Sequence, residues 1–568
     1  MAAEAVTVTV TGATGPARTA AESVVQTIDW LAVLPPVVVA AVALLVLVAD
    51  LFVRESRKHL LGLASVGGLA VALLSLIPLR KGDRTTFCLV DDPTACSYTA
   101  DYFALAIQAL VLGGALLTAL LSLTAAKDDK RLPAGEYWFL LLSSAAGAAL
   151  LPASRDLATL VVALEVASLP AFALVGLRRG DKRSSEAALK FFLSSVTATA
   201  VMLLGVSFVY ATTGTMHLTE IATRLDDVPA QLDTLAQAGV ALTLVGFAFK
   251  TAAAPFHFWV PDTYAGAPLP VAAYLSVVGK AVGFSGLILV TVVAFPSYAD
   301  VWGPALAVLA ALTMTVGNVA ALRQSATRAR GAIRLLAWSS VGQAGYLLVP
   351  IAAAAYTSDA QIGSTVAYAL MYAVVNLGAF AVAAVVARTK PLHRLCDYRG
   401  LYATHPLAAL ALGFFLLCLA GLPPGIIGLF AKVAVFSAAV DAGLGWLAVV
   451  MAVNVVIALF YYLQWTALLF RTPEGAPAPG EAAGGAPASQ ETAAGTRTRQ
   501  EDAAGTRAPH ETAAGAPASA EGGEAPRRPG LPVPVPLALA IVLTFAAGIV
   551  LSGVPQLILR FATGTLFQ

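Results

Sequence analysis

The chain has 568 residues, of which 58% are hydrophobic and only 12% are charged, and its formal net charge is +2. Soluble domains are about 45–50% apolar and about 25% charged. The composition therefore excludes a soluble enzyme, a coiled coil and a nucleic-acid-binding protein, and predicts an all-α polytopic membrane protein.

Apolar runs long enough to cross a bilayer follow one another along the chain. We expect about 14 transmembrane helices, at 31–53, 59–79, 101–126, 136–151, 155–177, 186–212, 236–258, 268–295, 301–323, 330–356, 361–388, 406–436, 441–471 and 532–560. The first 30 residues lack the basic start and adjoining apolar core of a secretory signal.

Basic residues indicate the orientation of these spans. Lysine and arginine gather in the loops after odd-numbered runs, such as 178–183, 323–334 and 388–399, and are sparse after even-numbered runs. Basic loops stay on the cytoplasmic side. With an even number of spans, both termini are predicted to be extracytoplasmic.

The segment before the last span differs from the rest of the chain. Residues 473–530 consist mainly of Ala, Gly, Pro, Glu and Thr, and three ten-residue units repeat at 491–520. Such a segment buries too little apolar surface to offset its ordering entropy. We interpret it as a disordered cytoplasmic linker without a specific function.

Two lysines lie beside prolines inside apolar runs. Lys250 precedes Pro255 and Pro261, and Lys432 follows the pair Pro423 and Pro424. Proline breaks a helix, and a broken helix at membrane depth is tolerated only against protein or a water-filled cavity. The repeated design is typical of an internally duplicated transporter, and a buried lysine there can load and release a proton. For Lys250 the alternative is a lysine that reaches the interface.

Five further polar residues lie in the apolar runs. Glu165 is the acid deepest within a span, and either a nearby lysine keeps it ionised or the pair only fixes helix packing. Lys280 lies mid-span; Lys190 is either a helix-surface partner of Glu186 or a point of proton entry. His257 is either a proton shuttle or a packed neutral histidine, and Gln343 can order water but carries no charge.

Cysteine and glycine patterns exclude several cofactor sites. The four cysteines form no CxxC pair, and no glycine-rich phosphate loop follows a strand-like run. We predict no cofactor and no metal in this chain. Cys88 and Cys96 share a loop expected outside, where they form a disulfide or remain two thiols.

The chain resembles the N-type antiporter-like membrane subunit of bacterial NADH-quinone oxidoreductase, or complex I. The matching segments are LEVASLPAFALVG, EAALKFFLSS, FKTAAAPFHFWVPDTYAGAPLPVAAYLSVVGK, IRLLAWSSVGQAGYLL and LAGLPPGIIGLFAK, spread over residues 160–436. The run Tyr-Ala-Gly-Ala-Pro favours the N-type over the sister L-type and M-type subunits.

The resemblance implies two inverted five-helix repeats with broken helices, in a bacterial cell-membrane protein. It divides the chain into an N-terminal extracytoplasmic segment (1–30), N-terminal transmembrane helices (31–151), a first half-channel (152–300), a second half-channel (301–471), the linker (472–530) and a C-terminal transmembrane helix (531–568).

The resemblance also implies roles in proton translocation. Glu165 and Lys250 would be the paired acid and lysine of the first half-channel, Lys280 the central relay and Lys432 the terminal lysine. The family usually has a histidine where this chain has Gln343, so that step must use water or another group.

The implied cofactors are NADH, FMN, iron–sulfur clusters and quinone in the whole complex, and the implied partners are its other membrane-arm subunits, notably neighbouring antiporter-like and small membrane subunits. Two alternatives remain: a subunit of a multi-subunit Na⁺/H⁺ antiporter, and a structural subunit that pumps nothing.

Overall fold

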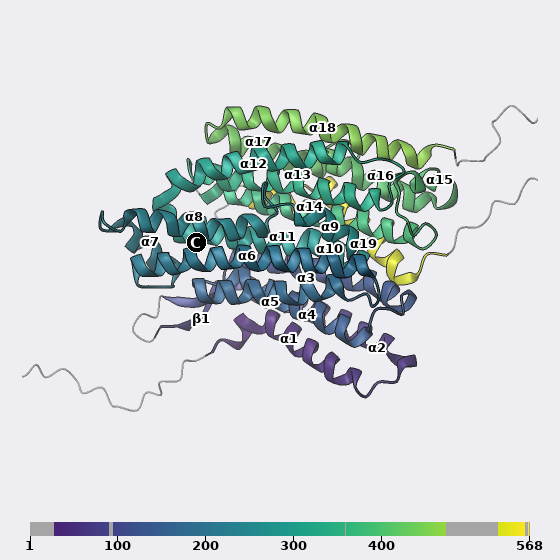
Figure 1. The fold of residues 1–568 in the computed structure, drawn as a ribbon, viewed down its shortest axis with the longest axis horizontal. Helices are drawn as coiled ribbons and strands as arrows, with labels where there is room; N and C mark the ends of the chain where they lie inside the picture. The colour runs from purple at the N-terminus through teal and green to yellow at the C-terminus, as the bar shows by residue number, and fades with distance from the viewer. Residues whose placement is uncertain (1–27, 90–94, 358, 473–531, 563–565, 567–568) are drawn as a thin grey trace, which may run out of the picture.

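The computed structural model describes residues 28–89, 95–357, 359–472, 532–562 and 566, and consists mainly of helices packed side by side (Figure 1). The helices of the first half are α1 (Trp30–Asp50), α2 (His59–Leu74), α3 (Tyr102–Asp128), α4 (Ala134–Leu150), α5 (Leu157–Gly176), α6 (Lys182–Thr213), α7 (Leu218–Asp226), α8 (Asp233–Lys250), α9 (Trp259–Gly266), α10 (Leu269–Tyr274) and α11 (Lys280–Ile288).

The second half of the chain also consists of helices. Its helices are α12 (Ala299–Leu322), α13 (Gly331–Ala354), α14 (Ile362–Ala387), α15 (Leu401–Thr404), α16 (Pro406–Ala420), α17 (Ile426–Asp441), α18 (Gly445–Phe470), α19 (Val535–Gly553) and α20 (Gln556–Ala562). Short 3₁₀ turns are η1 (Glu55–Arg57), η2 (Pro78–Lys81), η3 (Leu151–Ala153), η6 (Pro296–Tyr298), η7 (Asp359–Gln361) and η8 (Leu395–Tyr398), and two π-helical turns are η4 (Leu275–Gly279) and η5 (Leu289–Ala294).

Twelve helices are long and apolar enough to cross a membrane, among the described residues. Of the other two predicted spans, 236–258 covers α8 and the break before α9, and 406–436 covers the interrupted pair α16/α17. The all-α polytopic fold class is confirmed, whereas the count of fourteen stays a prediction. The predicted 1–30 and 472–530 segments lie almost entirely outside the described residues.

Aspartates start four of the long helices. The carboxylates of Asp29, Asp101, Asp156 and Asp181 accept backbone N–H groups in the first turns of α1, α3, α5 and α6. Capping satisfies donors that have no partner within the helix. These four aspartates thus mark the residue at which each of these helices begins.

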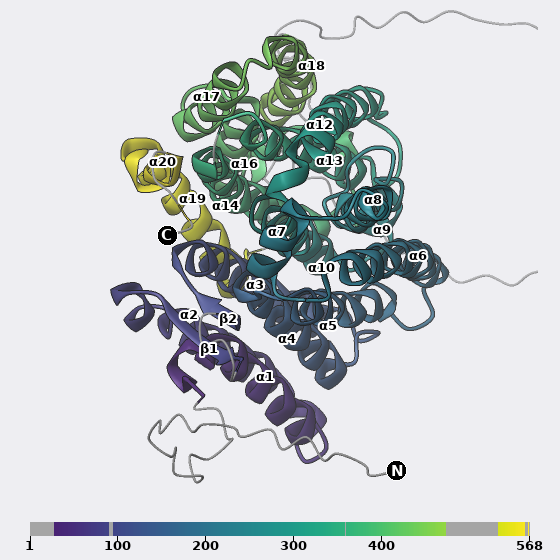
Figure 2. The same ribbon diagram turned by 90° about the vertical axis from the view of Figure 1, so that its left-hand side faces the viewer.

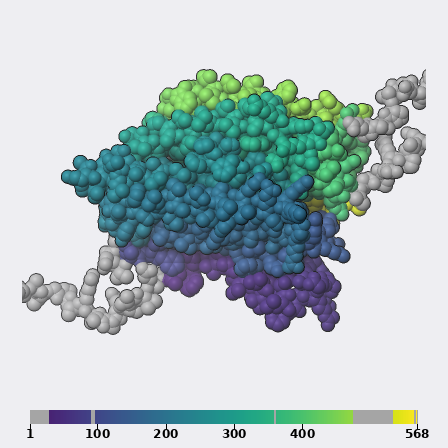
Figure 3. Space-filling model, in the orientation of Figure 1, coloured from purple at the N-terminus to yellow at the C-terminus, as the bar shows by residue number. Residues whose placement is uncertain are grey.

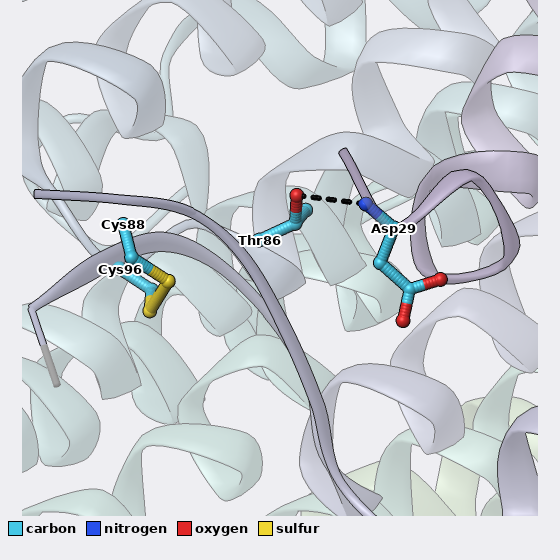
Figure 4. Close-up of a disulfide and its surroundings, with 4 residues drawn as sticks. All are labelled: Asp29, Thr86, Cys88 and Cys96. Atoms are coloured by element: carbon cyan, nitrogen blue, oxygen red, sulfur yellow. Dashed lines mark hydrogen bonds between the residues drawn. A yellow bond between two sulfur atoms is a disulfide. The ribbon is translucent and has the colours of Figure 1, made fainter. Parts of the chain in front are cut away.

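The described residues also contain one β-hairpin, which the sequence did not predict. Strands β1 (Arg84–Cys88) and β2 (Cys96–Ala100) pair antiparallel with Arg84 opposite Ala100. Cys88 and Cys96 are joined by a disulfide, and the Asp29 backbone N–H donates to Thr86 Oγ1 at 3.1 Å (Figure 4). The hairpin is therefore tied to the start of α1.

The bundle has two distinct ends. The hairpin and α7 lie at one end, on the left in Figure 1, which we call the hairpin end. The loops around 128–133, 177–181, 323–330 and 388–400 lie at the opposite, arginine-rich end. The segment from α8 to α9 runs toward the arginine-rich end and the segment from α16 to α17 runs away from it, as expected for inverted repeats.

The most buried elements are α13, the run from α10 to η5, α3 and α14. Figure 2, which looks along the bundle, shows α10 and α14 near its centre and α6, α12, α18 and α1 around it. In the space-filling view α1 and α2 form one edge of the molecule (Figure 3). Of the candidate lysines, Lys280 lies on these central elements, Lys250 and Lys432 are buried, and Lys190 lies on the outer helix α6.

Candidate functional site

The first broken helix consists of α8 and α9, and its N-terminal half, α8, ends at Lys250. Residues 251–258 form the break, and the Ala254–Pro255 peptide bond is cis. The Ala254 N–H donates to Thr313 Oγ1 at 2.8 Å, and Trp259 Nε1 donates to the Phe249 carbonyl at 3.3 Å. Side chains from neighbouring elements thus satisfy backbone groups that the break releases, as membrane depth requires.

Lys250 and Glu165 are brought together. The Lys250 ammonium donates to Ser168 Oγ at 2.7 Å and to Ser195 Oγ at 2.9 Å, and lies 3.8 Å from Glu165 Oε1. Thr199 donates to the same Glu165 oxygen at 2.8 Å. This is a loose ion pair with three hydroxyl partners. Ser168 and Ser195 can stabilise the Lys250 charge, and Thr199 the Glu165 charge, when the other member of the pair is neutral.

The two members of the pair differ in exposure. The Lys250 side chain is 8% exposed and that of Glu165 is 24% exposed. Glu165 is at mid-helix, as the sequence indicates, but it sits toward the outer face of α5, between exposed Val162 and Leu169. The pair therefore connects the bundle interior with the outer surface of α5.

Lys280 lies at the centre of the bundle. It starts α11 immediately after the π-helical turn η4, and its ammonium donates to the Ser340 carbonyl of α13. The residue is 2% exposed. Widened turns of this kind recur at functional sites, and no sequence signal marks this one.

Lys432 lies on the far side of the second break. Its ammonium donates to the carbonyls of Leu419 at 2.9 Å and Ala420 at 2.7 Å, at the end of α16. It also lies 5.7 Å from the Tyr346 ring centroid. The last carbonyls of a helix lack internal partners and carry its negative dipole end, so the break itself stabilises the ammonium charge.

A small cavity of about 30 Å³ lies between Lys250 and the turn that precedes Lys280. Its lining includes Ser168, Tyr274 and Gly279 as well as Lys250. The volume is sufficient for one water molecule. The Tyr274 hydroxyl donates to Ser144 Oγ at 2.9 Å, so polar groups line the cavity from both sides.

Gln343 bridges two buried tyrosines. Its amide donates to the Tyr462 hydroxyl at 3.1 Å, and its carbonyl oxygen accepts from the Tyr368 hydroxyl. The Tyr368 ring stacks on Tyr346, with centroids 6.1 Å apart, and Tyr346 faces Lys432. Toward Lys280, the Tyr372 hydroxyl donates to Ser340 Oγ at 2.8 Å.

The hydroxyl groups thus extend from the surroundings of Lys280 to those of Lys432. Sequence reasoning found Gln343 but missed these tyrosines. The available signal was the four-residue spacing of Tyr368 and Tyr372 within an apolar run, which places both hydroxyls on one face of a helix.

Lys190 is a half-exposed residue near the arginine-rich end. Its ammonium lies 2.7 Å from Glu186 and 3.0 Å from Asp262, and Arg334 lies 2.8 Å from the other Asp262 oxygen. The expected surface pair with Glu186 is present, and Asp262 adds a link between α6, α9 and α13 that sequence reasoning missed. Asp262 stands in the motif that carried the resemblance, which was the available signal.

His257 lies in the first break and is partly buried. Its ring centroid is 5.5 Å from that of Trp338 on α13. This contact fits the packed neutral histidine. The shuttle alternative stays a prediction.

No group of three or more His, Cys, Asp or Glu residues that could hold a metal ion occurs within the described part of the chain. The absence of a cofactor and of a metal from this chain stays a prediction.

Residues 154–458 match the family described as "NADH:quinone oxidoreductase/Mrp antiporter, TM". Together with the broken helices and the buried lysines, this match defines an antiporter-like membrane subunit.

Closer relatives define the subunit type. The chain is 76% identical over 547 residues to NADH-quinone oxidoreductase subunit N 2 of Streptomyces griseus subsp. griseus, covering 96% of each chain. It is 46% identical over 473 residues to subunit N of Salinispora tropica, covering 80% of this chain and 88% of that one. The chain belongs to the NADH-quinone oxidoreductase subunit N family, as the sequence motifs predicted.

Solved structures agree with this membership. The fold matches a chain of respiratory complex I from Thermus thermophilus with a TM-score of 0.68 and 28% identity, covering 93% of this chain and 100% of that chain. It also matches a chain of the Mrp complex from Dietzia sp. DQ12-45-1b with a TM-score of 0.72 and 21% identity, covering 94% and 96%. The second likeness shows the fold alone.

Proposed function

We propose that this chain translocates protons as subunit N of complex I, driven by NADH-to-quinone electron transfer in other subunits. The observation that carries the proposal is the set of three buried lysines on separate elements, two of them at broken helices. NADH, FMN, iron–sulfur clusters and quinone belong to other subunits, and neighbouring antiporter-like and small membrane subunits are the partners.

In the first half-channel, Glu165 and Lys250 act as a coupled pair. When a change in a neighbouring subunit draws Glu165 away, Lys250 loses its negative partner while it remains buried among Ser168 and Ser195. Burial then favours its neutral form, and the proton leaves. Moving one charge against 100 mV costs about 2.3 kcal/mol, so the change at the pair must be at least of that order.

The released proton passes to Lys280. The 30 Å³ cavity between Lys250 and Gly279 supports a single bridging water. Packing supports the same route, because α11 approaches the end of α8 so closely that a Cβ on Gly283 would lie 2.8 Å from the Lys250 carbonyl carbon.

From Lys280 the charge moves to Lys432 through the second half. Tyr372, Tyr462 and Tyr368 supply hydroxyl groups along the way, with water in the remaining gaps. Gln343 cannot titrate, so its role is to orient the hydroxyls of Tyr368 and Tyr462. The residues 152–300 and 301–471 then serve as the two half-channels.

The orientation belongs to the proposal as well. The basic loops support a cytoplasmic position for the arginine-rich end, with both termini on the extracytoplasmic side of a bacterial cell membrane. The linker at 472–530 would be cytoplasmic.

Replacing Lys250 by alanine tests the proposal. We expect Lys250→Ala to reduce the protons moved per NADH oxidised to near background, because a neutral methyl cannot carry the charge. The measurement is NADH-driven dye quenching in inside-out membrane vesicles, normalised to NADH oxidation in the same vesicles.

Lys182→Ala, at the exposed start of α6, is the matched control and should pump normally. A native gel stained for NADH dehydrogenase activity verifies that each variant assembles. Normal pumping by an assembled Lys250→Ala complex would refute the lysine relay. Migration of the tagged chain away from that activity, with Na⁺-dependent proton flux, would instead support the antiporter alternative.

A further inference from the structure

An apolar groove runs along the outer face of α6, α8 and α9, which lie together in Figure 2. Its volume is about 770 Å³. The lining comes from Leu193, Thr197 and Val201 of α6, from Val245 and Phe249 of α8, and from Phe256, Phe258 and Trp259 around the first break. Leu193 and Phe258 are more than half exposed, so the groove opens outward at membrane depth.

A second, basic pocket of about 330 Å³ lies at the arginine-rich end of the same helices. It is lined by five basic side chains, Arg183, Lys190, Arg328, Arg330 and Arg334, and by two acidic ones, Glu186 and Asp262. Lys190 and Arg334 already neutralise both acids. Positive charge is therefore left in excess.

The excess resides on Arg183, Arg328 and Arg330. Arg183 and Arg328 are exposed and form no side-chain hydrogen bond or ion pair with other residues that the structure describes. Burial lowers the pKa of Arg330, and the nearby Arg183 and Arg178 guanidinium groups lower it further against the opposing effect of Asp181. An anion in this pocket would relieve that repulsion.

The groove and the pocket lie on either side of the Lys190–Asp262 ion pair. Lys190 and Asp262 line both of them. One ligand can thus lie with an apolar chain along α6 and an anionic group among the arginines. Basic pockets between transmembrane helices on the cytoplasmic side are suited to anionic lipid headgroups.

We propose that the groove and the basic pocket together form a binding site for an anionic phospholipid of the cytoplasmic leaflet. An acyl chain occupies the groove, and the headgroup phosphate contacts Arg183 and Arg328. Charge complementarity at one end and apolar lining at the other select this ligand over a neutral lipid or a soluble anion. The choice of leaflet rests on the proposed orientation, whereas the site itself does not depend on the proposed proton route.

Photo-crosslinking tests the site in the whole complex. The purified complex is reconstituted in phosphatidylcholine vesicles that contain a minor fraction of photo-activatable phosphatidylglycerol, and labelled peptides are identified by mass spectrometry. We expect labelling of peptides that contain residues 193–201 and 256–262, and much weaker labelling when the photo-activatable lipid is phosphatidylcholine.

Two variants separate the headgroup from the chain. Arg183→Gln with Arg328→Gln should reduce phosphatidylglycerol labelling by about fivefold for each arginine removed, since a basic residue beside an anionic surface contributes about 1 kcal/mol. Thr197→Trp fills the groove and should reduce labelling by both lipids.

Matched controls are Arg54→Gln with Arg57→Gln, which lie outside the pocket, and Val196→Trp, which lies on α6 outside the groove. Equal labelling by the two lipids would overturn the proposal, because the arginines would then recognise nothing. Absent labelling would also overturn it. A protein cross-linker that then joins these peptides to a neighbouring subunit would identify the face as a protein interface.

Discussion

At the residue scale, the buried lysines differ in the groups that hold them. Lys250 has a carboxylate at 3.8 Å, whereas Lys280 and Lys432 donate to backbone carbonyls. A carboxylate can move or be neutralised, but a carbonyl dipole is fixed by its helix. Only the Glu165–Lys250 pair is therefore suited to receive an external signal, and the other two lysines are suited to pass charge on.

A substitution at Gln343 tests the proposed proton route through the second half-channel. Gln343→Leu keeps the volume but leaves the Tyr368 and Tyr462 hydroxyls without this partner. We expect pumping per NADH to fall about tenfold, which corresponds to ~1.4 kcal/mol, or about 0.7 kcal/mol for each of the two buried hydrogen bonds. NADH-driven dye quenching measures the effect.

Gln343→His can still donate and accept, and should retain most of the pumping. Gln237→Leu, on the exposed face of α8, is the control. If Gln343→Leu pumps like the unsubstituted chain, Gln343 does not orient the relay.

His393 makes stability depend on pH. It lies in the loop after α14, and burial, followed by the nearby Arg330 charge, lowers its pKa from 6.5 to about 4. Between these values the unfolded chain binds a proton that the folded chain does not, so the free energy of unfolding falls as the pH drops through this window. The thermal unfolding midpoint of the purified complex should fall by a few degrees between about pH 7 and about pH 5.

Replacing His393 by asparagine isolates this effect. His393 has φ +50°, which asparagine tolerates better than most residues. The acid-dependent decrease in the midpoint should shrink in His393→Asn, and an unchanged decrease would assign it to other groups.

At the element scale, the sequence predicted both breaks but not what surrounds them. Proline next to a lysine in an apolar run is a local signal, so Lys250 and Lys432 could be identified. The π-helical turn before Lys280 and the link from Lys190 through Asp262 to Arg334 arise from packing between distant segments. The hairpin was missed because its two strands are short and lie in a polar segment between two apolar runs.

Close contact between α8 and α11 provides a prediction at this scale. A Cβ on Gly283 would lie 2.8 Å from the Lys250 carbonyl carbon and 3.0 Å from its oxygen. Gly283→Ala must push α11 away from the first break, and overpacking of this kind costs about 1–3 kcal/mol. The thermal unfolding midpoint should fall, and pumping per NADH should fall with it.

Gly113→Ala is the matched control, because a Cβ on Gly113 meets no atom within 4 Å. In a helix interior this exchange is favourable by up to about 1 kcal/mol. A Gly283→Ala complex as stable as that control would show that the contact between the helices is not tight.

At the scale of the whole molecule, composition and motifs were sufficient for the fold class and the family. Apolar length, basic loops and the Tyr-Ala-Gly-Ala-Pro run depend on sequence alone. The position of Glu165 at the outer face of α5 was not accessible, because periodicity does not distinguish a lipid-facing from a core-facing apolar side chain. The basic loops, which the sequence assigned to one side of the membrane, lie at one end of the bundle (Figure 1).

The predicted orientation follows from those ends and can be tested directly. Lys130 at the arginine-rich end and Asp227 at the hairpin end are both exposed. Each is changed to cysteine in a Cys396→Ala background, because Cys396 is a partly exposed free thiol. A membrane-impermeant maleimide should label Lys130→Cys in inside-out vesicles and Asp227→Cys in intact spheroplasts, since basic loops remain in the cytoplasm.

The opposite pattern would show that the protein has the reverse orientation, and would reverse the side from which Lys250 takes its proton in the proposed route. It would also move the basic pocket beside Arg183 to the outer leaflet. Labelling of both cysteines in both preparations would instead indicate leaky membranes, which the Lys182→Ala pumping control detects independently. One labelling experiment thus fixes the direction of the proton route and the leaflet from which a lipid would enter the groove.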